Sequence, residues 1–226
     1  MYRKDTLSNG IRVVSETMPK SRSMSIGVWV KVGSRHESPQ IGGVSHFIEH
    51  LFFKGTEKRT AKDIAIEIDA LGGEMNAFTS QEATTYYVKV LDEHLPTAID
   101  ILADILLGSE FDPQEMDKER KVILEEIKSV EDAPDDYIHE FLTNTVWPDN
   151  SLGRPILGTK DTIKALTHKD IIDYIENYYS PKEIVISVAG NFDHDPMVEM
   201  LNTSFGKLAR TGIAKQEATP TFTHAI

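Results

Sequence analysis

The sequence of 226 residues contains no cysteine. Disulfides and thiolate metal ligands are therefore excluded, and a bound metal ion would have to be held by histidine and carboxylate side chains. No apolar run reaches the roughly 20 residues that a membrane-spanning helix needs, so no membrane partner is expected. The first residues also lack the apolar stretch of a secretory signal. We therefore expect a cytoplasmic protein.

Basic side chains are scarce relative to acidic ones. The chain has 24 lysines and arginines against 36 aspartates and glutamates, which gives a net charge of −12. This balance argues against nucleic acid as a partner, because a surface that binds phosphates is positively charged. It is compatible with cationic peptides as ligands, although the solubility of the protein alone also explains an acidic surface.

Hydrophobic periodicity predicts strands and helices that do not alternate regularly, which is typical of an α+β domain. Thr60 with Asp63, and Thr167 with Asp170, resemble capping boxes at helix starts. Asp112 should cap a further helix that begins with proline. We expect two layers, a mainly antiparallel mixed sheet with helices packed on one face. The expected strands include residues 6–7, 11–14, 25–32, 74–79, 84–90 and 183–190, and the expected helices cover 43–54, 60–71, 95–107, 113–131, 135–147, 167–180 and 196–205.

The most informative stretch is His46-x-x-Glu49-His50. Residues four apart share one face of a helix, so the two histidines could bind one metal ion together. An acid next to the second histidine can act on a water in an open metal position, and the order H-x-x-E-H is the inverzincin signature. The alternative is two surface histidines on an amphipathic helix. A wide apolar stripe that includes Leu51 and Phe52 indicates instead a mostly buried helix.

A catalytic zinc site usually has three protein ligands and one open position, so a third ligand is required. Without cysteine, a carboxylate or a further histidine must supply it. Glu119 and Glu126 share an otherwise apolar face of the helix expected over residues 113–131, roughly 10 Å apart along its axis. A carboxylate on a buried face is costly unless it is paired or bound to metal. Only one of the two could bind the ion directly; alternatively, both flank the apolar stripe and reach water.

Residues 42–56, Gly-Gly-Val-Ser-His-Phe-Ile-Glu-His-Leu-Phe-Phe-Lys-Gly-Thr, resemble the active-site helix of the pitrilysin/insulinase family of zinc metallopeptidases. Residues 72–80, 119–126, 152–158 and 188–191 match further stretches of that family. The resemblance therefore covers nearly the whole chain. It is greatest to the bacterial processing-protease branch, which is similar to the mitochondrial processing peptidase β-subunit, and it implies a bacterial, cytoplasmic protein.

The resemblance implies roles for individual residues. His46, His50 and Glu126 would bind Zn²⁺, one ion per chain, and Glu49 would act as the general base. Glu119 matches a further glutamate that the family needs for activity. The implied reaction is the hydrolysis of extended peptides or presequence-like segments by a metal-activated water.

The resemblance also implies contacts with the substrate. Family members bind an extended peptide as an added strand, and Asn76 and Ala77 match the edge strand that receives it. Phe53 matches a residue that lines the pocket just past the scissile bond. Asp136 and Glu140 match two acids that receive a substrate arginine in the processing peptidases, although a solvated helix face explains them equally well.

The length of the chain departs from the family pattern. Members of this branch are normally about twice as long, with two similar α+β halves that close on the substrate. Residues 1–226 are therefore expected to form a single N-terminal catalytic domain, with about the last 15 residues as a linker towards an absent C-terminal domain. The expected partner is a homologous C-terminal half or subunit, and a dimer is expected.

Two alternatives to an active peptidase remain from the sequence. A non-catalytic zinc-binding or scaffold subunit typically has a broken motif, whereas the motif here is intact. A zinc-storing surface protein would not explain an apolar helix face that carries Glu119 and Glu126. A zinc metalloendopeptidase that depends on a partner for full activity is therefore the leading hypothesis.

Overall fold

The computed structural model describes residues 2–215. Its strands form one mixed sheet in the order β1-β2-β6-β3-β5-β4, so β1 and β4 are the edges. Neighbouring strands are antiparallel except for β2 and β6, which are parallel. The strands are β1 (Tyr2–Thr6), β2 (Arg12–Thr17), β3 (Ser23–Val30), β4 (Glu74–Thr79), β5 (Thr84–Leu91) and β6 (Ile184–Gly190).

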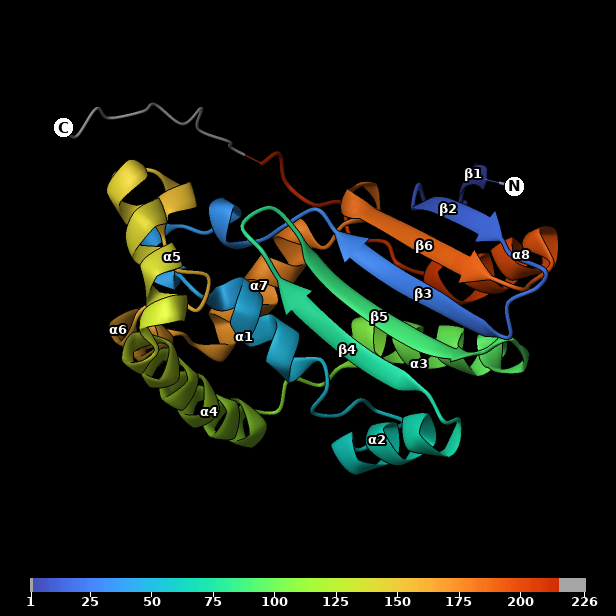
Figure 1. The fold of residues 1–226 in the computed structure, drawn as a ribbon, viewed down its shortest axis with the longest axis horizontal. Helices are drawn as coiled ribbons and strands as arrows, with labels where there is room; N and C mark the ends of the chain where they lie inside the picture. The colour runs from blue at the N-terminus through green and yellow to red at the C-terminus, as the bar shows by residue number, and fades with distance from the viewer. Residues whose placement is uncertain (1, 216–226) are drawn as a thin grey trace.

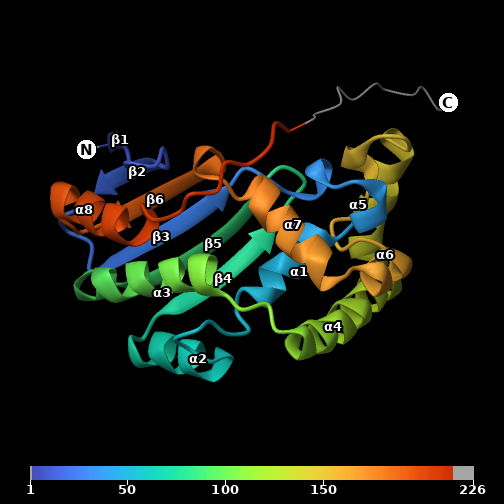
Figure 2. The same ribbon diagram turned by 180° about the vertical axis from the view of Figure 1, so that it is seen from behind.

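The helices cover one face of this sheet and gather at one of its ends. Figure 1 looks onto the open face, and Figure 2 shows α3, α7 and α8 lying across the other. Helices α1, α4, α5 and α6 stand together beyond the end of β4 (Figure 1). The helices are α1 (Val44–Leu51), α2 (Ala61–Ala70), α3 (Leu95–Gly108), α4 (Pro113–Asp132), α5 (Pro134–Val146), α6 (Lys160–Ala165), α7 (His168–Tyr178) and α8 (His194–Phe205).

Alternating side chains explain why only one face of the sheet is covered. Along β3, Met24, Ile26 and Val28 are buried, whereas Ser25 and Trp29 point to the other face and are exposed. A strand period of two places such residues on opposite sides of the sheet. The buried set forms a single core with the helices. The prediction of a two-layer α+β domain with helices on one face is confirmed.

All three predicted helix caps are confirmed. The side chains of Thr60 and Thr167 accept the N–H groups of Asp63 and Asp170, and Asp112 caps α4. Several elements differ from the sequence patterns, among them β1, which covers Tyr2–Thr6 where a strand was expected over residues 6–7. Helix α1 ends at Leu51 rather than near residue 54, α8 begins at His194, two residues before the proline expected to start it, and α6 was not predicted. Helix α6 has six residues and one buried side chain, too few to give a periodic pattern.

Two further predictions concern membrane-spanning helices and the expected C-terminal linker. Within residues 2–215, none of the helices is both long and apolar enough to cross a membrane. Residues 206–215 form neither helix nor strand. The predicted linker lies mostly beyond residue 215, outside the described residues.

A glycine allows close packing at the start of α1. Gly43 has φ +92, in the left-handed region, and a Cβ atom there would lie 2.6 Å from the carbonyl oxygen of Leu157. Residues other than glycine pay a steric penalty in this conformation and would also clash with the segment around Leu157. Gly43 therefore lets residues 154–158 approach the helix that carries the histidine motif.

We expect Gly43→Ala to lower the free energy of unfolding by about 3 kcal/mol, through backbone strain and overpacking together. Gly10→Ala is the matched control, because Gly10 has φ +96 with nothing within 4 Å of a new Cβ. Backbone strain alone should reduce its stability by about 1 kcal/mol. Urea denaturation measures both values, and equal losses would contradict the packing argument.

Candidate metal centre

Helix α1 presents both motif histidines on one face, as their spacing predicts. Val44, Ile48 and Leu51 lie on the opposite side and are buried in the core. His46 is buried and His50 is half-buried, and their ring centroids are 4.6 Å apart. Core packing therefore fixes a short helix that offers two imidazoles side by side.

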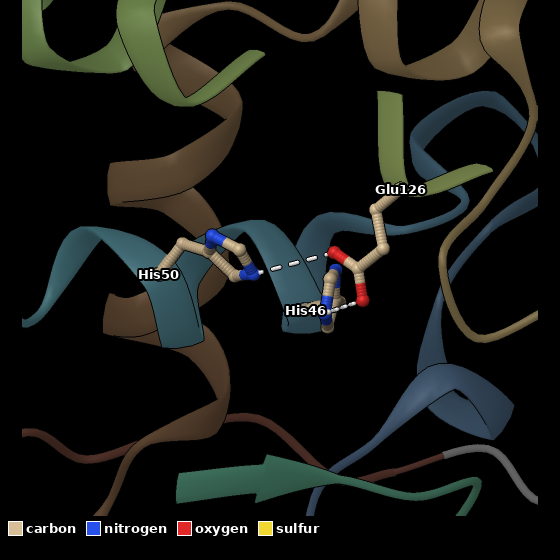
Figure 3. Close-up of side chains that lie close together, drawn as sticks. All are labelled: His46, His50 and Glu126. Carbon is tan, nitrogen blue, oxygen red and sulfur yellow. Dashed lines mark ion pairs between the residues drawn. The ribbon is translucent and has the colours of Figure 1, made fainter. Parts of the chain in front are cut away.

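Helix α4 brings Glu126 to this pair from a distant part of the sequence (Figure 3). Nε2 of His46 lies 3.7 Å from Oε1 of Glu126, and Nε2 of His50 lies 3.6 Å from Oε2. One ligand atom from each residue falls within 4.8 Å of the others. In the part of the chain that the structure describes, no other group of three histidine or acidic side chains converges in this way.

These separations fit a zinc ion. Zinc–nitrogen and zinc–oxygen bonds of roughly 2.0–2.2 Å place tetrahedral ligand atoms about 3.4 Å apart. The observed separations of 3.6 and 3.7 Å, each to a different oxygen of Glu126, are close to that value and too long for hydrogen bonds. The three side chains therefore surround a shared space rather than bond to one another.

His46 is in the protonation state that a metal ligand requires. Burial, assisted by the neighbouring His50, lowers the pKa of His46 to about 3. The imidazole is then neutral near pH 7 and keeps a free lone pair on one nitrogen. His46 and Glu126 therefore lie close together as two potential metal ligands and not as an ion pair.

Glu119 lies behind His50 and orients its ring. Oε2 of Glu119 is 3.1 Å from Nδ1 of His50, and Nζ of Lys54 donates to Oε1 at 2.8 Å. Because a carboxylate only accepts, the proton belongs on Nδ1, and Nε2 keeps the lone pair that faces Glu126. Histidines that ligate metals commonly have such a carboxylate on their other nitrogen.

The structure thus gives different positions to the two glutamates that helical periodicity left equivalent. Glu126 joins the two histidines, whereas Glu119 contacts the far side of one of them. Glu119 is buried, as the apolar face of α4 predicts, but the side chain of Glu126 is 40% exposed. Glu126 lies at the edge of the apolar stripe, where the site opens to solvent.

Glu49 connects the motif to the sheet. Its Oε2 accepts a hydrogen bond of 2.5 Å from Oγ1 of Thr79, the last residue of the edge strand β4. Burial raises the pKa of the Glu49 carboxyl above its usual range, and the bond from Thr79 opposes the rise. A raised pKa makes the carboxylate a stronger base.

A carboxylate from outside the motif caps α1. Glu37 is buried, and its two oxygens accept the backbone N–H groups of Gly43, at 2.7 Å, and of Ser45, at 2.8 Å. Burial raises the pKa of Glu37 to about 7, although these two bonds and the nearby Arg154 all favour the charged form. Glu37 thereby satisfies N–H groups that the first turn of a helix leaves without a partner.

Three of the predicted substrate contacts lie close to α1 or on the edge strand. Phe53 follows the end of α1 and is half-buried, with its ring 6.5 Å from that of Tyr86. Asn76 and Ala77 lie on β4, which pairs only with β5 in the described sheet. Asn76 is exposed, and its Oδ1 accepts the N–H of Ala77 at 2.8 Å.

The other two predicted contacts lie one turn apart on α5 and differ in their surroundings. Glu140 lines a cavity of about 480 Å³ together with Glu131, Tyr137 and Phe141. Burial, and to a lesser extent the charge of Glu131, raises the pKa of Glu140. Asp136 is exposed in the first turn of α5 and is not one of the residues that line this cavity.

Sequence patterns did not identify three residues that contact the site. Lys54 follows His50 by four positions, so the helix expected over residues 43–54 would have placed it near His50, although α1 itself ends at Leu51. Glu37 and Thr79 carry no such signal, because their contacts with α1 depend on how a loop and a strand end pack against it. Local periodicity does not report such contacts.

We expect Glu119→Gln to raise the dissociation constant for Zn²⁺ by about tenfold to a hundredfold. A neutral amide is a weaker acceptor for the His50 N–H and leaves Lys54 without its carboxylate. Glu125→Gln is the matched control, since Glu125 is exposed on the same helix and pairs with Lys128. Competition with a chromophoric chelator measures the constants, and equal values for the two variants would contradict the role of Glu119.

Proteins of known sequence and structure resemble this chain. It is 48% identical to "Uncharacterized zinc protease YmxG" of Bacillus subtilis, over 96% of this chain and 54% of that protein. It is 42% identical to "Probable mitochondrial-processing peptidase subunit beta, mitochondrial" of Arabidopsis thaliana, over 92% and 39%. A crystal structure of a protease from Helicobacter pylori matches with a TM-score of 0.90 at 28% identity, over 98% and 54%. The chain thus spans between 39% and 54% of the length of these relatives.

Family models match consecutive parts of the chain. Residues 12–160, which include α1, β4 and α4, match the model described as Insulinase (Peptidase family M16). Residues 165–225 match the model described as Peptidase M16 inactive domain. The first match alone covers well over half of the chain and contains all three side chains that converge in Figure 3. The chain belongs to the insulinase family of peptidases, family M16.

Proposed function

We propose that this chain is the zinc-binding, catalytic part of a metalloendopeptidase that cleaves extended peptides or presequence-like segments. The observation that carries the proposal is the convergence of His46, His50 and Glu126 within 4.8 Å. Glu49, between the two histidines in sequence, adds a base that is hydrogen-bonded to an edge strand. Membership in a peptidase family supports the reaction class.

The proposed metal is Zn²⁺, one ion per chain. Nε2 of His46, Nε2 of His50 and a carboxylate oxygen of Glu126 would hold it, and the names of the zinc-protease relatives support this choice. When bound, zinc supplies a Lewis acid that polarises a carbonyl group and lowers the pKa of water towards neutrality. Three protein ligands leave room for water and substrate.

Glu49 is the proposed general base. Its carboxylate takes a proton from the attacking water, which its raised pKa favours, and passes that proton to the nitrogen of the leaving amine. Thr79 holds one carboxylate oxygen and leaves the other available for the proton. Glu119 supports the reaction by keeping the ring of His50 in place.

We propose that the substrate binds as an added strand along β4. This strand forms one edge of the described sheet, and its last residue, Thr79, reaches Glu49. A peptide paired with β4 would therefore run towards the general base. Asn76 and Ala77 would contact its backbone, and Phe53 would line the pocket for the side chain just past the scissile bond.

Basic side chains are the proposed feature of the substrate. The net charge of −12 attracts cationic peptides, and the cavity beside Glu140 and Glu131 could receive a lysine or arginine. Asp136, one helical turn before Glu140, is proposed as a second acid contact at the surface of α5.

A partner is proposed to complete the site. The chain spans 54% of the Bacillus subtilis relative and 54% of the Helicobacter pylori structure. We propose that residues 1–226 form one catalytic domain that works with a homologous C-terminal half or subunit, in a dimer. A cytoplasmic location in a bacterium is part of the same proposal.

We expect Glu49→Gln to keep the zinc content of the unaltered chain and to lose at least about a hundredfold in peptide cleavage, because the amide cannot accept the proton. Atomic absorption measures zinc, and a fluorogenic basic peptide measures cleavage. Glu57→Gln is the control, since Glu57 is an exposed acid shortly after α1. Undiminished cleavage by Glu49→Gln would refute the role of Glu49.

Adding a homologous C-terminal half should increase the rate of peptide cleavage by this chain. Closure of a second half over the substrate would exclude water and help to hold the peptide. The measurement compares cleavage by the chain alone with cleavage by the chain mixed with that half. A monomeric chain whose cleavage is unaffected by the addition would argue against the dependence.

A further inference from the structure

The two proposed histidine ligands are held in place differently. Nδ1 of His50 contacts Glu119, which orients the ring. Nδ1 of His46 is buried and has no hydrogen-bond partner within residues 2–215. The direction of the His46 ring therefore depends on packing and on where the backbone of α1 places it.

Glu37 fixes the backbone immediately before His46. Its Oε2 accepts the N–H of Gly43 and its Oε1 accepts the N–H of Ser45. The first N–H groups of a helix have no partner inside the helix, and Gly43, at the N-cap position, has no side chain to provide one. The cap of α1 therefore comes from a carboxylate that precedes the helix by several residues.

Arg154 and Tyr174 stabilise the contact between Glu37 and α1. Nη2 of Arg154 donates to the backbone oxygen of Glu37 at 2.6 Å. Oγ of Ser45 lies 3.0 Å from the hydroxyl of Tyr174 on α7. The first turn of α1 is thus held directly by Glu37 and Tyr174, and Arg154 holds the backbone of Glu37. The residue that follows Ser45 is His46.

The chemistry of the contact requires a carboxylate. Glu37 is only 5% exposed, and burial raises its pKa because it disfavours the charged form. A glutamine would fill the same space without a charge. It would, however, offer one oxygen and one NH₂ group, and the NH₂ group would face an N–H donor. Each carboxylate oxygen of Glu37 accepts one backbone N–H group, which explains why an acid occupies this position.

We infer that Glu37 is a positioning residue for the metal site, whose two carboxylate oxygens fix the first turn of α1 and thereby hold the imidazole of His46 towards Glu126. The inference rests on the proposed zinc site. It adds a residue that does not touch the metal ligands and lies nine positions before His46 in the sequence.

The dissociation constant for Zn²⁺ tests this role without any measurement of cleavage. It is measured by chelator competition for the unaltered chain, Glu37→Gln and Ser15→Ala, at a temperature where circular dichroism shows all three folded. Glu37→Gln should raise the constant by about tenfold or more. Ser15→Ala removes an equally buried hydrogen bond, between β2 and His194 on α8. These two elements lie at the far end of the sheet from α1 (Figure 1), so the constant should stay unchanged.

A spectroscopic signature separates positioning from general support of the fold. The visible absorption of bound Co²⁺ reports coordination geometry, and Glu37→Gln should alter it while Ser15→Ala does not. If Glu37→Gln fails to fold, Glu37→Asp takes its place with the same expectations, because the shorter side chain cannot reach both N–H groups.

An unchanged dissociation constant and an unchanged Co²⁺ spectrum in the folded Glu37 variant would overturn the positioning role and leave the zinc site intact. A failure of the unaltered chain to bind Zn²⁺ would overturn the proposed function, and this inference with it.

Discussion

Burial of α1 is the constraint on which the rest of the candidate site depends. Val44, Ile48 and Leu51 fill the core, so the other face of the same short helix carries His46 and His50 towards α4. Helix α4 packs against α1 and delivers Glu126, and the end of β4 reaches Glu49 through Thr79. The metal ligands, the base and the edge strand therefore meet because core packing fixes the rotation of α1 about its axis.

Different surroundings give similar acids different tasks. Glu119 is buried but receives Lys54 and His50, so it can orient a ring as a carboxylate. Glu126 is partly exposed and faces Nε2 of both histidines without a hydrogen bond, which suits a metal ligand. Glu49 has a pKa raised by burial, which suits proton transfer. Such divergence between neighbouring carboxyl groups is how an active site assigns the roles of base and ligand.

Local signals predicted much of the fold and only part of the site. The capping residues Thr60, Asp112 and Thr167 marked helix starts correctly, because a cap acts within one turn. Periodicity placed Glu119 and Glu126 on one face of α4 but could not show which one meets the histidines, since that depends on how α4 crosses α1. The contacts of Glu37 and Thr79, and the separation of Asp136 from the cavity beside Glu140, likewise arise from tertiary packing.

The central claim is that one zinc ion binds between His46, His50 and Glu126. Crystals of the chain grown with Zn²⁺, with anomalous differences recorded at the zinc absorption edge, test it most directly. The account predicts one strong peak about 2.0–2.2 Å from the Nε2 atoms of both histidines and from a carboxylate oxygen of Glu126. A fully occupied zinc ion held by other residues, or no peak between these three, would contradict it.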